Sequence, residues 1–233
     1  MSIRKFRFDS LSSVQPEACV HLEKNEENHL FRILRALPGT KIELLDGEGL
    51  IAQAEVEQGK TIRISSIRKY DTPSRRIHLY IAPPRRQKMD AVLREAAELG
   101  VWRIVPMICE FGVSEPDRES VAGRWNDALF EACKQSGNPY LPRTCEPMRF
   151  ADAVADCGKN CSVLYYGSPT DSGRLQEEGC DIAWFVGPEG GFSEKEIGIL
   201  KNAEGISLRI GNWILRVETA AIAGIATLLQ EKK

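Results

Sequence analysis

Residues 182–196 read IAWFVGPEGGFSEKE, an apolar run that passes directly into a glycine-rich turn. The run IAWFV is typical of a strand that is buried on both faces of a sheet. Glycines at the carboxyl end of such a strand let the backbone approach a ligand, and open α/β sheets place their binding sites there. Ser193 and Glu196 have the spacing of a capping box, so the next helix should begin at Ser193.

The turn after this strand restricts the kind of ligand. Its spacing does not match GxGxxG, and no Lys-Ser or Lys-Thr pair follows, so a dinucleotide or nucleoside triphosphate is disfavoured. A glycine-rich turn that has an acid but no phosphate-binding lysine suits a ligand held by backbone groups. S-adenosylmethionine (SAM), an uncharged adenosine joined to a cationic sulfonium, fits this description. A plain structural turn between strand and helix remains an alternative.

A second segment, residues 209–220, reads RIGNWILRVETA and has the pattern of a strand, a short loop and a helix. Two such loops at adjacent strand ends could form the walls of one pocket. Arg216 and Glu218 bracket the start of a helix that continues as the apolar run AAIAGIATLL. Charges in such a place indicate an ion pair or a ligand contact, and a salt bridge that only fixes the loop remains the alternative.

Strand and helix patterns alternate from Arg76 onward, which predicts a parallel sheet covered by helices. The expected strands are 77–82, 103–106, 161–166, 182–186 and 207–210, and the expected helices are 88–99, 121–135, 150–155, 193–203 and one from Val217.

The first part of the chain, from Arg4 to about Tyr70, predicts a small β-barrel of short strands around one helix. Turn residues occur at 38–39, 46–49 and 58–59. The stretch 71–75 has linker composition, so we predict two domains, 1–72 and 73–233.

The single helix of this first domain is expected at residues 25–36, with the Asn25 side chain as its cap. Its apolar stripe should consist of Leu30, Ile33, Leu34 and Leu37, which leaves Arg32 and Arg35 to point to solvent.

Charge is unevenly distributed along the 233 residues, although the formal net charge is only −2. Residues 1–88 contain 16 Lys and Arg against 11 Asp and Glu, and the remainder contains 15 against 22. A basic N-terminal part suggests a polyanionic partner such as nucleic acid, with an ordinary solvated surface as the alternative.

The longest apolar stretch, Ala220–Leu229, is too short to span a bilayer, and the N-terminus has no signal-peptide pattern, so we expect a cytosolic protein. None of the seven cysteines forms a CxxC motif, and Cys157 and Cys161 come nearest. We therefore expect reduced thiols and no metal. His21, His29 and His78 all precede the first helix of the second domain, so a catalytic triad should lack its base.

The paired segments GPEGGFSEKEI and ILRVETA, about twenty residues apart, resemble the signature of the RsmE-type methyltransferases of the SPOUT class. The similarity extends to RKFRF, NHLFRILRALPGTKIELLDGEG, KMDAVLREAAELGVWRIVPM and RWNDALFEACKQSG, in the same order along the chain. This resemblance implies SAM-dependent methylation of N3 of a uridine in bacterial small-subunit (16S) ribosomal RNA.

The resemblance also implies the fold class, an α/β SPOUT-type knotted parallel sheet with helices on both faces, preceded by a PUA-like β-barrel. Chain topology rules alone would favour an unknotted sheet. Family membership further implies a homodimer with each site completed near the interface, and ribosomal RNA or the small ribosomal subunit as the partner. By position, the cofactor residues would be Tyr166, Gly167, Gly187, Glu189, Gly190, Gly191, Ile210, Gly211, Ile214, Leu215 and Ala220.

The residues implied to face RNA are Arg4, Arg7, Arg32 and Arg35, which would neutralise phosphates. Phe6 and Phe8 could stack on bases, although core packing is expected for at least one of them. Glu95, Asn138 and Trp213 occupy positions where this family commonly has Lys, Arg and Arg. All three changes remove positive charge and weaken the assignment of the RNA substrate.

For catalysis, we expect Arg216 to stabilise negative charge on the uracil carbonyls, while Glu189 or Glu218 accepts the N3 proton. Two other hypotheses remain. The chain could be a catalytically inactive RNA-binding ribosome-assembly factor with the same fold, which SAM binding would exclude, or a nucleotide-binding α/β enzyme.

Overall fold

The computed structural model describes residues 3–115, 117–170, 173–175 and 180–230. The chain divides into two compact units. The first contains Met1–Thr72 and Phe130–Leu141, and the second contains Pro73–Leu129 and Pro142–Lys233. The first break follows Thr72, inside the linker-like stretch, and segment 130–141 was not expected in the first unit.

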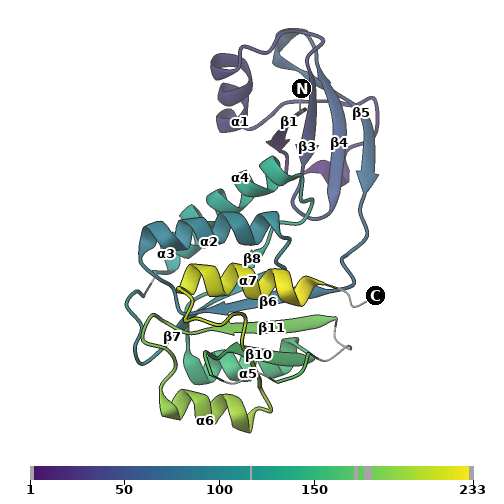
Figure 1. Cartoon of the computed structure of the whole chain (residues 1–233). Coiled ribbons are helices and arrows are strands. Elements are labelled where there is room, and N and C mark those ends of the chain that lie inside the picture. The colour runs from purple at the N-terminus through teal and green to yellow at the C-terminus, as the bar shows by residue number, and fades with distance from the viewer. Residues whose placement is uncertain (1–2, 116, 171–172, 176–179, 231–233) are drawn as a thin grey trace. The chain divides into compact units, whose positions relative to one another are not determined.

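The first unit is built on a curled five-stranded sheet with the order β1-β3-β4-β5-β2 (Figure 1). Strand β1 pairs with β3 in parallel, and the other pairs are antiparallel. The elements are β1 (Arg4–Arg7), a 3₁₀ turn (Leu11–Ser13), β2 (Cys19–Val20), α1 (Lys24–Asn28), a π-helical turn (His29–Ile33), β3 (Lys41–Leu45), β4 (Leu50–Val56), a 3₁₀ turn (Gln58–Lys60) and β5 (Ile62–Lys69).

Segment 130–141 belongs to the first unit because its end is hydrogen bonded to the turn 46–49. The Leu141 N–H donates to the Gly47 carbonyl at 2.8 Å, and the Gly49 N–H donates to the Pro139 carbonyl at 3.0 Å. Phe130 adds to a small buried cluster of the same unit. These contacts join residues about ninety positions apart, and no local pattern in the sequence predicts them.

The predicted helix 25–36 is shorter than expected and is capped differently. It begins at Lys24 with Glu23 as the N-cap, and no side chain accepts a capping hydrogen bond. Asn25 lies inside the first turn and does not cap the helix. The continuation His29–Ile33 is π-helical, and Arg35 has a positive φ of 53° that ends the helix.

The apolar stripe predicted for this helix is only partly correct. Leu30 is buried and Leu34 is half-buried, but Ile33 and Leu37 are each 71% exposed. The π-helical turn changes the angular spacing of successive side chains, so the 3.6-residue period fails here. Arg32 and Arg35 are exposed, as expected.

The second unit contains a sheet whose main path is β12-β10-β11-β6-β7-β8, with β9 also paired to β7. Every described pair is parallel. The strands are β6 (Arg76–Ile81), β7 (Arg103–Ile108), β8 (Arg143–Thr144), β9 (Met148–Arg149), β10 (Val163–Gly167), β11 (Asp181–Val186) and β12 (Ile206–Leu208).

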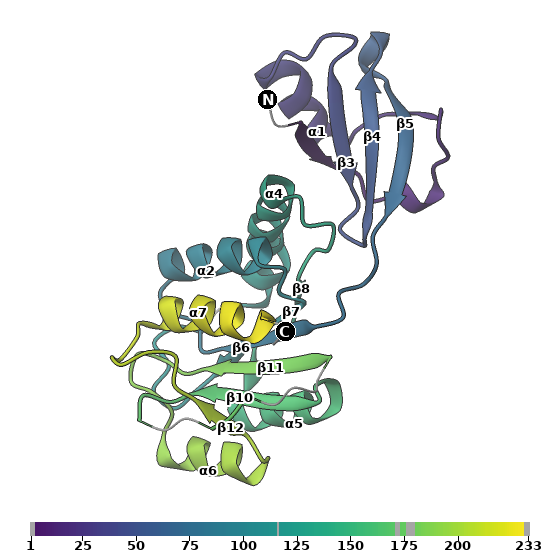
Figure 2. The same ribbon diagram turned by 45° about the vertical axis from the view of Figure 1, so that its right-hand side comes forward.

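Helices cover both faces of this sheet, as predicted. Both views show α2 and α7 side by side over one face, with α5 and α6 on the other (Figures 1 and 2). The helices are α2 (Arg86–Glu98), α3 (Arg118–Ser120), a π-helical turn (Val121–Trp125), α4 (Asn126–Ser136), α5 (Phe150–Asn160), α6 (Glu194–Asn202) and α7 (Val217–Leu229). Helix α4 contains residues of both units, because the division of the chain falls after Leu129.

The strand quoted at the outset, β11, lies in the middle of the sheet between β10 and β6. Ile182–Val186 are all buried, which confirms the two-sided burial that the sequence predicts. After β12 at the sheet edge, the chain returns to the sheet centre, where α7 packs on β6 and β11. The segment between β12 and α7 therefore passes β10 on its way back to the sheet centre.

The charge difference between the two halves disappears when the chain is divided as the structure divides it. The first unit contains 12 Lys and Arg and 12 Asp and Glu, and the second contains 19 and 21. Arg75, Arg76, Arg85, Arg86 and Lys88, which made the N-terminal part basic, belong to the second unit. Net charge therefore gives no support to RNA binding by the first unit.

No helix among the described residues is long and apolar enough to cross a membrane.

Candidate functional site

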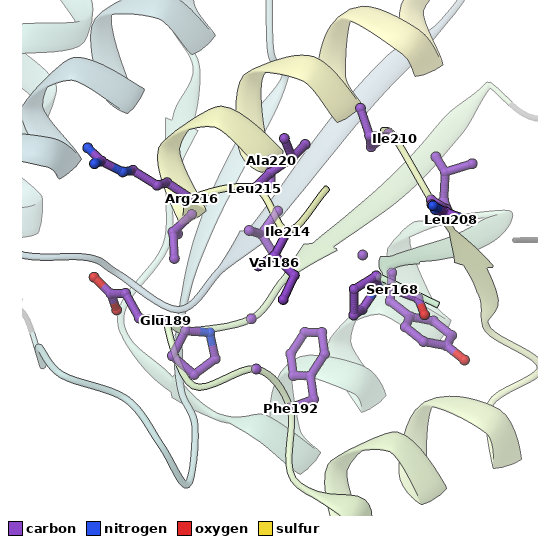
Figure 3. Close-up of a pocket in the computed structure, with 18 of the residues that line it drawn as sticks. Ser168, Val186, Glu189, Phe192, Leu208, Ile210, Ile214, Leu215, Arg216 and Ala220 are labelled. Atoms are coloured by element: carbon purple, nitrogen blue, oxygen red, sulfur yellow. The ribbon is translucent and has the colours of Figure 1, made fainter. Parts of the chain in front are cut away.

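A cavity of about 620 Å³ lies at the carboxyl edge of the second unit's sheet. The loops that follow β10, β11 and β12 line it, together with the start of α7 (Figure 3). Its volume is within the range of about 300–1,000 Å³ that small-molecule sites have. Because parallel strands all end at one edge, three loops far apart in the sequence meet here.

The loop after β11 is held by a buried carboxylate. Ser193 and Glu196 form the predicted capping box: Ser193 Oγ accepts from the Glu196 N–H, and Glu196 Oε2 accepts from the Ser193 N–H at 2.8 Å. Glu196 is only 5% exposed, and its Oε1 also accepts from the Glu110 N–H at 2.9 Å. One side chain thus joins the loop after β11 to the segment after β7.

The same loop contains the tight turn that its glycines predicted. The Gly191 N–H donates to the Pro188 carbonyl at 2.9 Å, and Gly191 has a φ of 76°, in the left-handed region that favours glycine. A Cβ added at Gly190 would lie 3.0 Å from the Phe111 Cβ. Nearby, burial first and then Glu196 raise the pKa of the Cys109 thiol to about 12, so this thiol stays protonated.

The loop after β12 is held by one arginine and exposes large apolar groups. Arg209 donates from Nε to the Gly211 carbonyl at 2.9 Å and from Nη2 to the Asn212 carbonyl at 3.3 Å. Trp213 and Ile214 are 84% and 86% exposed, although both line the cavity.

Every residue that the sequence assigned to the cofactor lies in the lining of this one cavity. They are Tyr166, Gly167, Gly187, Glu189, Gly190, Gly191, Ile210, Gly211, Ile214, Leu215 and Ala220.

Several lining residues were missed, among them Ser168, Phe192 and Leu208. Phe192 directly follows the predicted glycine turn, so its position next to the glycines could have indicated it. Ser168 and Leu208 lie at two strand ends, and the Ser168 N–H donates to the Leu208 carbonyl at 3.1 Å. Only the order of the strands in the sheet brings these two residues together.

The charged residues expected in catalysis occupy different places. Arg216 and Glu189 line the cavity and lie on the same side of it (Figure 3). Glu218 is not among the lining residues. Its Oε1 lies 3.3 Å from Lys88 Nζ, and its buried Oε2 has no hydrogen-bond partner among the described residues. The sequence allowed either an ion pair or a ligand contact for Glu218, and the structure shows the ion pair.

The basic residues expected to face RNA lie on the first unit. Arg4, Arg32 and Arg35 are exposed. Arg7 is half-buried, because its guanidinium binds Asp9 at 2.7 Å and lies 4.7 Å from the centre of the Phe130 ring.

Phe6 is 1% exposed and belongs to the core of the first unit, so it cannot stack on a base. Phe8 is half-buried and packs against the same core.

The positions that depart from the family pattern are surface or turn residues. Glu95 and Trp213 are exposed. Asn138 is half-buried, and its Oδ1 accepts from the Tyr140 N–H at 3.0 Å, so it stabilises the turn before Leu141.

One histidine has a neighbour that its place in the sequence did not indicate. His78 comes before the first helix of the second unit, but the parallel sheet places it beside Asp181, with a distance of 2.9 Å between His78 Nε2 and Asp181 Oδ1. Burial lowers the pKa of the His78 imidazole, and interactions with Cys161 and Asp181 raise it by more. Position along the chain does not decide which side chains meet on a sheet.

Comparison with known proteins agrees with this arrangement. The family model for the RNA methyltransferase domain matches residues 71–229, and the model for the RNA methyltransferase PUA domain matches residues 22–65. Ribosomal RNA small subunit methyltransferase E of Aquifex aeolicus is 27% identical over 215 residues, covering 89% of this chain and 93% of that protein.

Solved structures are similar over nearly the whole chain. Ribosomal RNA small subunit methyltransferase E from Neisseria gonorrhoeae, bound to S-adenosyl methionine, is 26% identical with a TM-score of 0.87, and 97% of each chain is covered. A Legionella pneumophila protein in complex with SAM is 27% identical with a TM-score of 0.88, covering 98% of this chain and 97% of that one. The family model covers more than half of the sequence, and the chain belongs to the RNA methyltransferase family.

Proposed function

We propose that this protein uses SAM to methylate N3 of a uridine in bacterial small-subunit (16S) ribosomal RNA. The observation that carries the proposal is the single cavity formed by the predicted loops at the carboxyl edge of a SPOUT-type sheet. The relatives are ribosomal RNA small subunit methyltransferases E, and those solved with a ligand contain SAM.

The lining of the cavity fits SAM in both shape and chemistry. Val186, Phe192, Leu208 and Ile210 supply apolar surface for an adenine ring and ribose. An added Cβ at Gly211 would meet no atom within 4 Å, so backbone there is open to a ligand. The described residues that line the cavity include no lysine, in agreement with a ligand that has no phosphate.

When bound, SAM supplies an electrophilic methyl group for in-line transfer. The protein's part is to orient the uracil and to manage the N3 proton, since N3 must lose this proton before or during methylation. Arg216 at the cavity wall can stabilise negative charge on the uracil carbonyls. Glu189, on the same side and exposed, can accept the proton.

Glu218 is the less suitable proton acceptor of the two candidates. Its Oε1 pairs with Lys88, and its side chain lies outside the lining. We propose that Glu218 instead fixes the first turn of α7, which carries Arg216 at its N-cap. Lys88 belongs to α2, so this pair also joins α7 to α2.

The two parts of the chain are proposed to have separate roles: 1–72 as a PUA-like RNA-binding domain and 73–233 as the methyltransferase domain. Arg4, Arg32 and Arg35 are exposed and available for phosphates, and Arg7 contributes less because Asp9 already binds it. Binding should weaken with salt for each phosphate that these residues neutralise.

A homodimer is proposed because Trp213 and Ile214 are more than four-fifths exposed at the mouth of the cavity. Exposed apolar side chains that gather at one place mark an interaction surface. A second copy of the chain that covers this loop would also complete the wall of the site.

The test is incubation of small ribosomal subunits, or free 16S RNA, lacking the modification with protein and methyl-labelled SAM. Digestion to nucleosides and mass spectrometry should then find 3-methyluridine. The Arg216→Ala variant should retain SAM affinity and lose at least about 100-fold in methylation rate. Full SAM binding by the wild type without methyl transfer would instead support an RNA-binding assembly factor.

A further inference from the structure

A cluster of thiols and polar side chains lies at the edge of the sheet opposite the cavity. His78 is near the start of β6, Asp181 is the first residue of β11, and Cys161 lies two residues before β10. Because these strands are parallel, their amino ends meet at one edge. Cys157, in the last turn of α5, is the second thiol of the cluster.

The imidazole of His78 is buried and oriented by a carboxylate. His78 is 4% exposed, and its Nε2 lies 2.9 Å from Asp181 Oδ1. Arg76 holds the same carboxylate with both ends of its guanidinium, including Nε to Oδ1 at 2.8 Å. The hydrogen bond with Arg76 lowers the pKa of Asp181, which keeps the carboxylate charged beside the imidazole.

The other imidazole nitrogen lacks a partner of regular geometry. His78 Nδ1 is buried without a hydrogen-bond partner among the described residues, while the Cys161 sulfur is near enough to affect its titration. Although burial disfavours the imidazolium, the interactions with Cys161 and Asp181 raise the pKa of His78 overall. A proton that moves from Cys161 to Nδ1 would create a thiolate and imidazolium pair.

The two thiols are adjacent at the end of α5. The Cys161 N–H donates to the Cys157 carbonyl at 2.8 Å, which places the residues one helical turn apart. Interaction with Cys157 and then with His78 lowers the pKa of the Cys161 thiol to about 6, against the effect of burial. The pKa of Cys157 is raised, first by Cys161 and then by burial, so it keeps its proton.

Asp156 and Arg103 form a second ion pair near the cluster. Tyr80 donates to Asp156 at 2.7 Å, and Arg103 binds the same carboxylate at 2.7 Å. The Arg103 Nε also donates to Cys145 Sγ at 2.9 Å. Asp156 is thus neutralised by Arg103, which leaves the His78 imidazole as the base of the cluster.

From this geometry we propose a redox-sensitive site: Cys161 is a reactive thiolate, His78 and Asp181 hold it in that state, and Cys157 is its resolving thiol. Cys161 is half-buried and therefore reachable by a small peroxide, whereas Cys157 is buried. The inference does not depend on the proposed methylation, because the cluster shares no residue with the cavity lining.

Hydrogen peroxide, or another small hydroperoxide, is the oxidant. The Cys161 thiolate attacks one peroxide oxygen, the O–O bond breaks, and hydroxide leaves as water once it is protonated, which produces a sulfenic acid. The Cys157 sulfur then attacks the Cys161 sulfur, the S–O bond breaks, and the thiol proton leaves with the second water. Two thiols are oxidised by two electrons, and one peroxide is reduced to two waters.

The first test is the pH profile of alkylation by iodoacetamide in the native protein, followed residue by residue by mass spectrometry. Cys19 and Cys180 are exposed and serve as internal controls. The alkylation rate of an unperturbed thiol rises roughly tenfold per pH unit up to about pH 8.5. The Cys161 rate should instead rise near pH 6 and level off by pH 7, whatever its accessibility.

The His78→Gln variant should move the Cys161 profile toward that of Cys19, and Asp181→Asn should move it part of the way. A wild-type Cys161 profile that parallels those of Cys19 and Cys180 would overturn the proposal without any variant. Methylation activity is a separate readout, so its loss or retention does not affect this result.

The second test is exposure to hydrogen peroxide, followed by blocking of free thiols and digestion with trypsin. Lys159 lies between the two cysteines, so a disulfide would link peptides 150–159 and 160–174, and a reductant would separate them. In Cys157→Ser, the Cys161 sulfenic acid should persist and react with dimedone. Peroxide-treated wild type without the linked pair would contradict the role of Cys157.

Discussion

The loops that follow β11 and β12 line the same cavity, but they are fixed in different ways. The first is tied by a buried carboxylate that accepts from the Ser193 and Glu110 backbones. The second is held by the exposed bonds of Arg209 to two of its own carbonyls and exposes Trp213 and Ile214. We infer that the first loop is preorganised for its ligand, and that the second becomes ordered when cofactor and a partner surface cover it.

The largest effect should come from removing the carboxylate that ties the first loop. Glu196→Ala leaves the buried Ser193 N–H and the Glu110 N–H without their acceptor, so the free energy of unfolding should fall by about 1–3 kcal/mol. Urea denaturation would measure this change. Lys195→Ala, an exposed neighbour on the same helix, should stay within about 0.5 kcal/mol of wild type. Equal effects of the two substitutions would contradict the role of Glu196.

A smaller effect is expected from the helix cap. Ser193→Ala removes the hydroxyl that accepts from the Glu196 N–H, and the loss of a cap destabilises by about 1 kcal/mol. Thermal unfolding should show a lower midpoint, whereas Ser193→Asp, which can still cap, should recover most of the stability. If Ser193→Asp were no better than Ser193→Ala, the cap would not be what fixes this loop.

In the second loop, Arg209→Ala should change ligand affinity more than stability. Its hydrogen bonds are exposed, so the free energy of unfolding should fall by less than about 1 kcal/mol. SAM affinity should fall by roughly 3- to 10-fold, because ordering the loop on binding would then reduce the net free energy of binding. Arg209→Lys keeps the charge without the forked geometry, and wild-type affinity in that variant would show that charge alone matters.

The smallest effect on unfolding is expected for Trp213→Ala, within about 0.5 kcal/mol, since the side chain is 84% exposed. Its effect should appear in self-association instead. Sedimentation velocity over a concentration series should show that the variant dissociates at higher concentration than wild type. If the wild-type protein stayed monomeric at every concentration, the proposed homodimer would be wrong.

The sequence predicted the first loop well because its signals are local. A buried strand, a glycine turn and a capping box occur within fifteen consecutive residues, and each was found where expected. The sequence also predicted that the loops after β11 and β12 line one cavity, but it placed them at adjacent strands, whereas β10 lies between β11 and β12.

What the sequence did not predict depends on contacts between distant residues. The ion pair of Glu218 joins α7 to α2, and segment 130–141 packs with a turn about ninety residues earlier. Ile33, the last residue of the π-helical turn, is exposed, and Leu37 is exposed because the helix ends before it, although the sequence pattern predicted that both would be buried. His78 and Cys161 meet only because β6 and the segment before β10 reach the same sheet edge.

The central claim is that the cavity binds SAM, and calorimetric titration of the protein with SAM tests it most directly. Wild type should bind, and the variant with both Gly190→Val and Gly191→Val should not, because Gly190 lies against Phe111 and Gly191 has a positive φ. The folded state of the variant is checked by circular dichroism. Equal affinity in a folded variant, or no binding by wild type at millimolar SAM with or without small ribosomal subunits, would contradict the account.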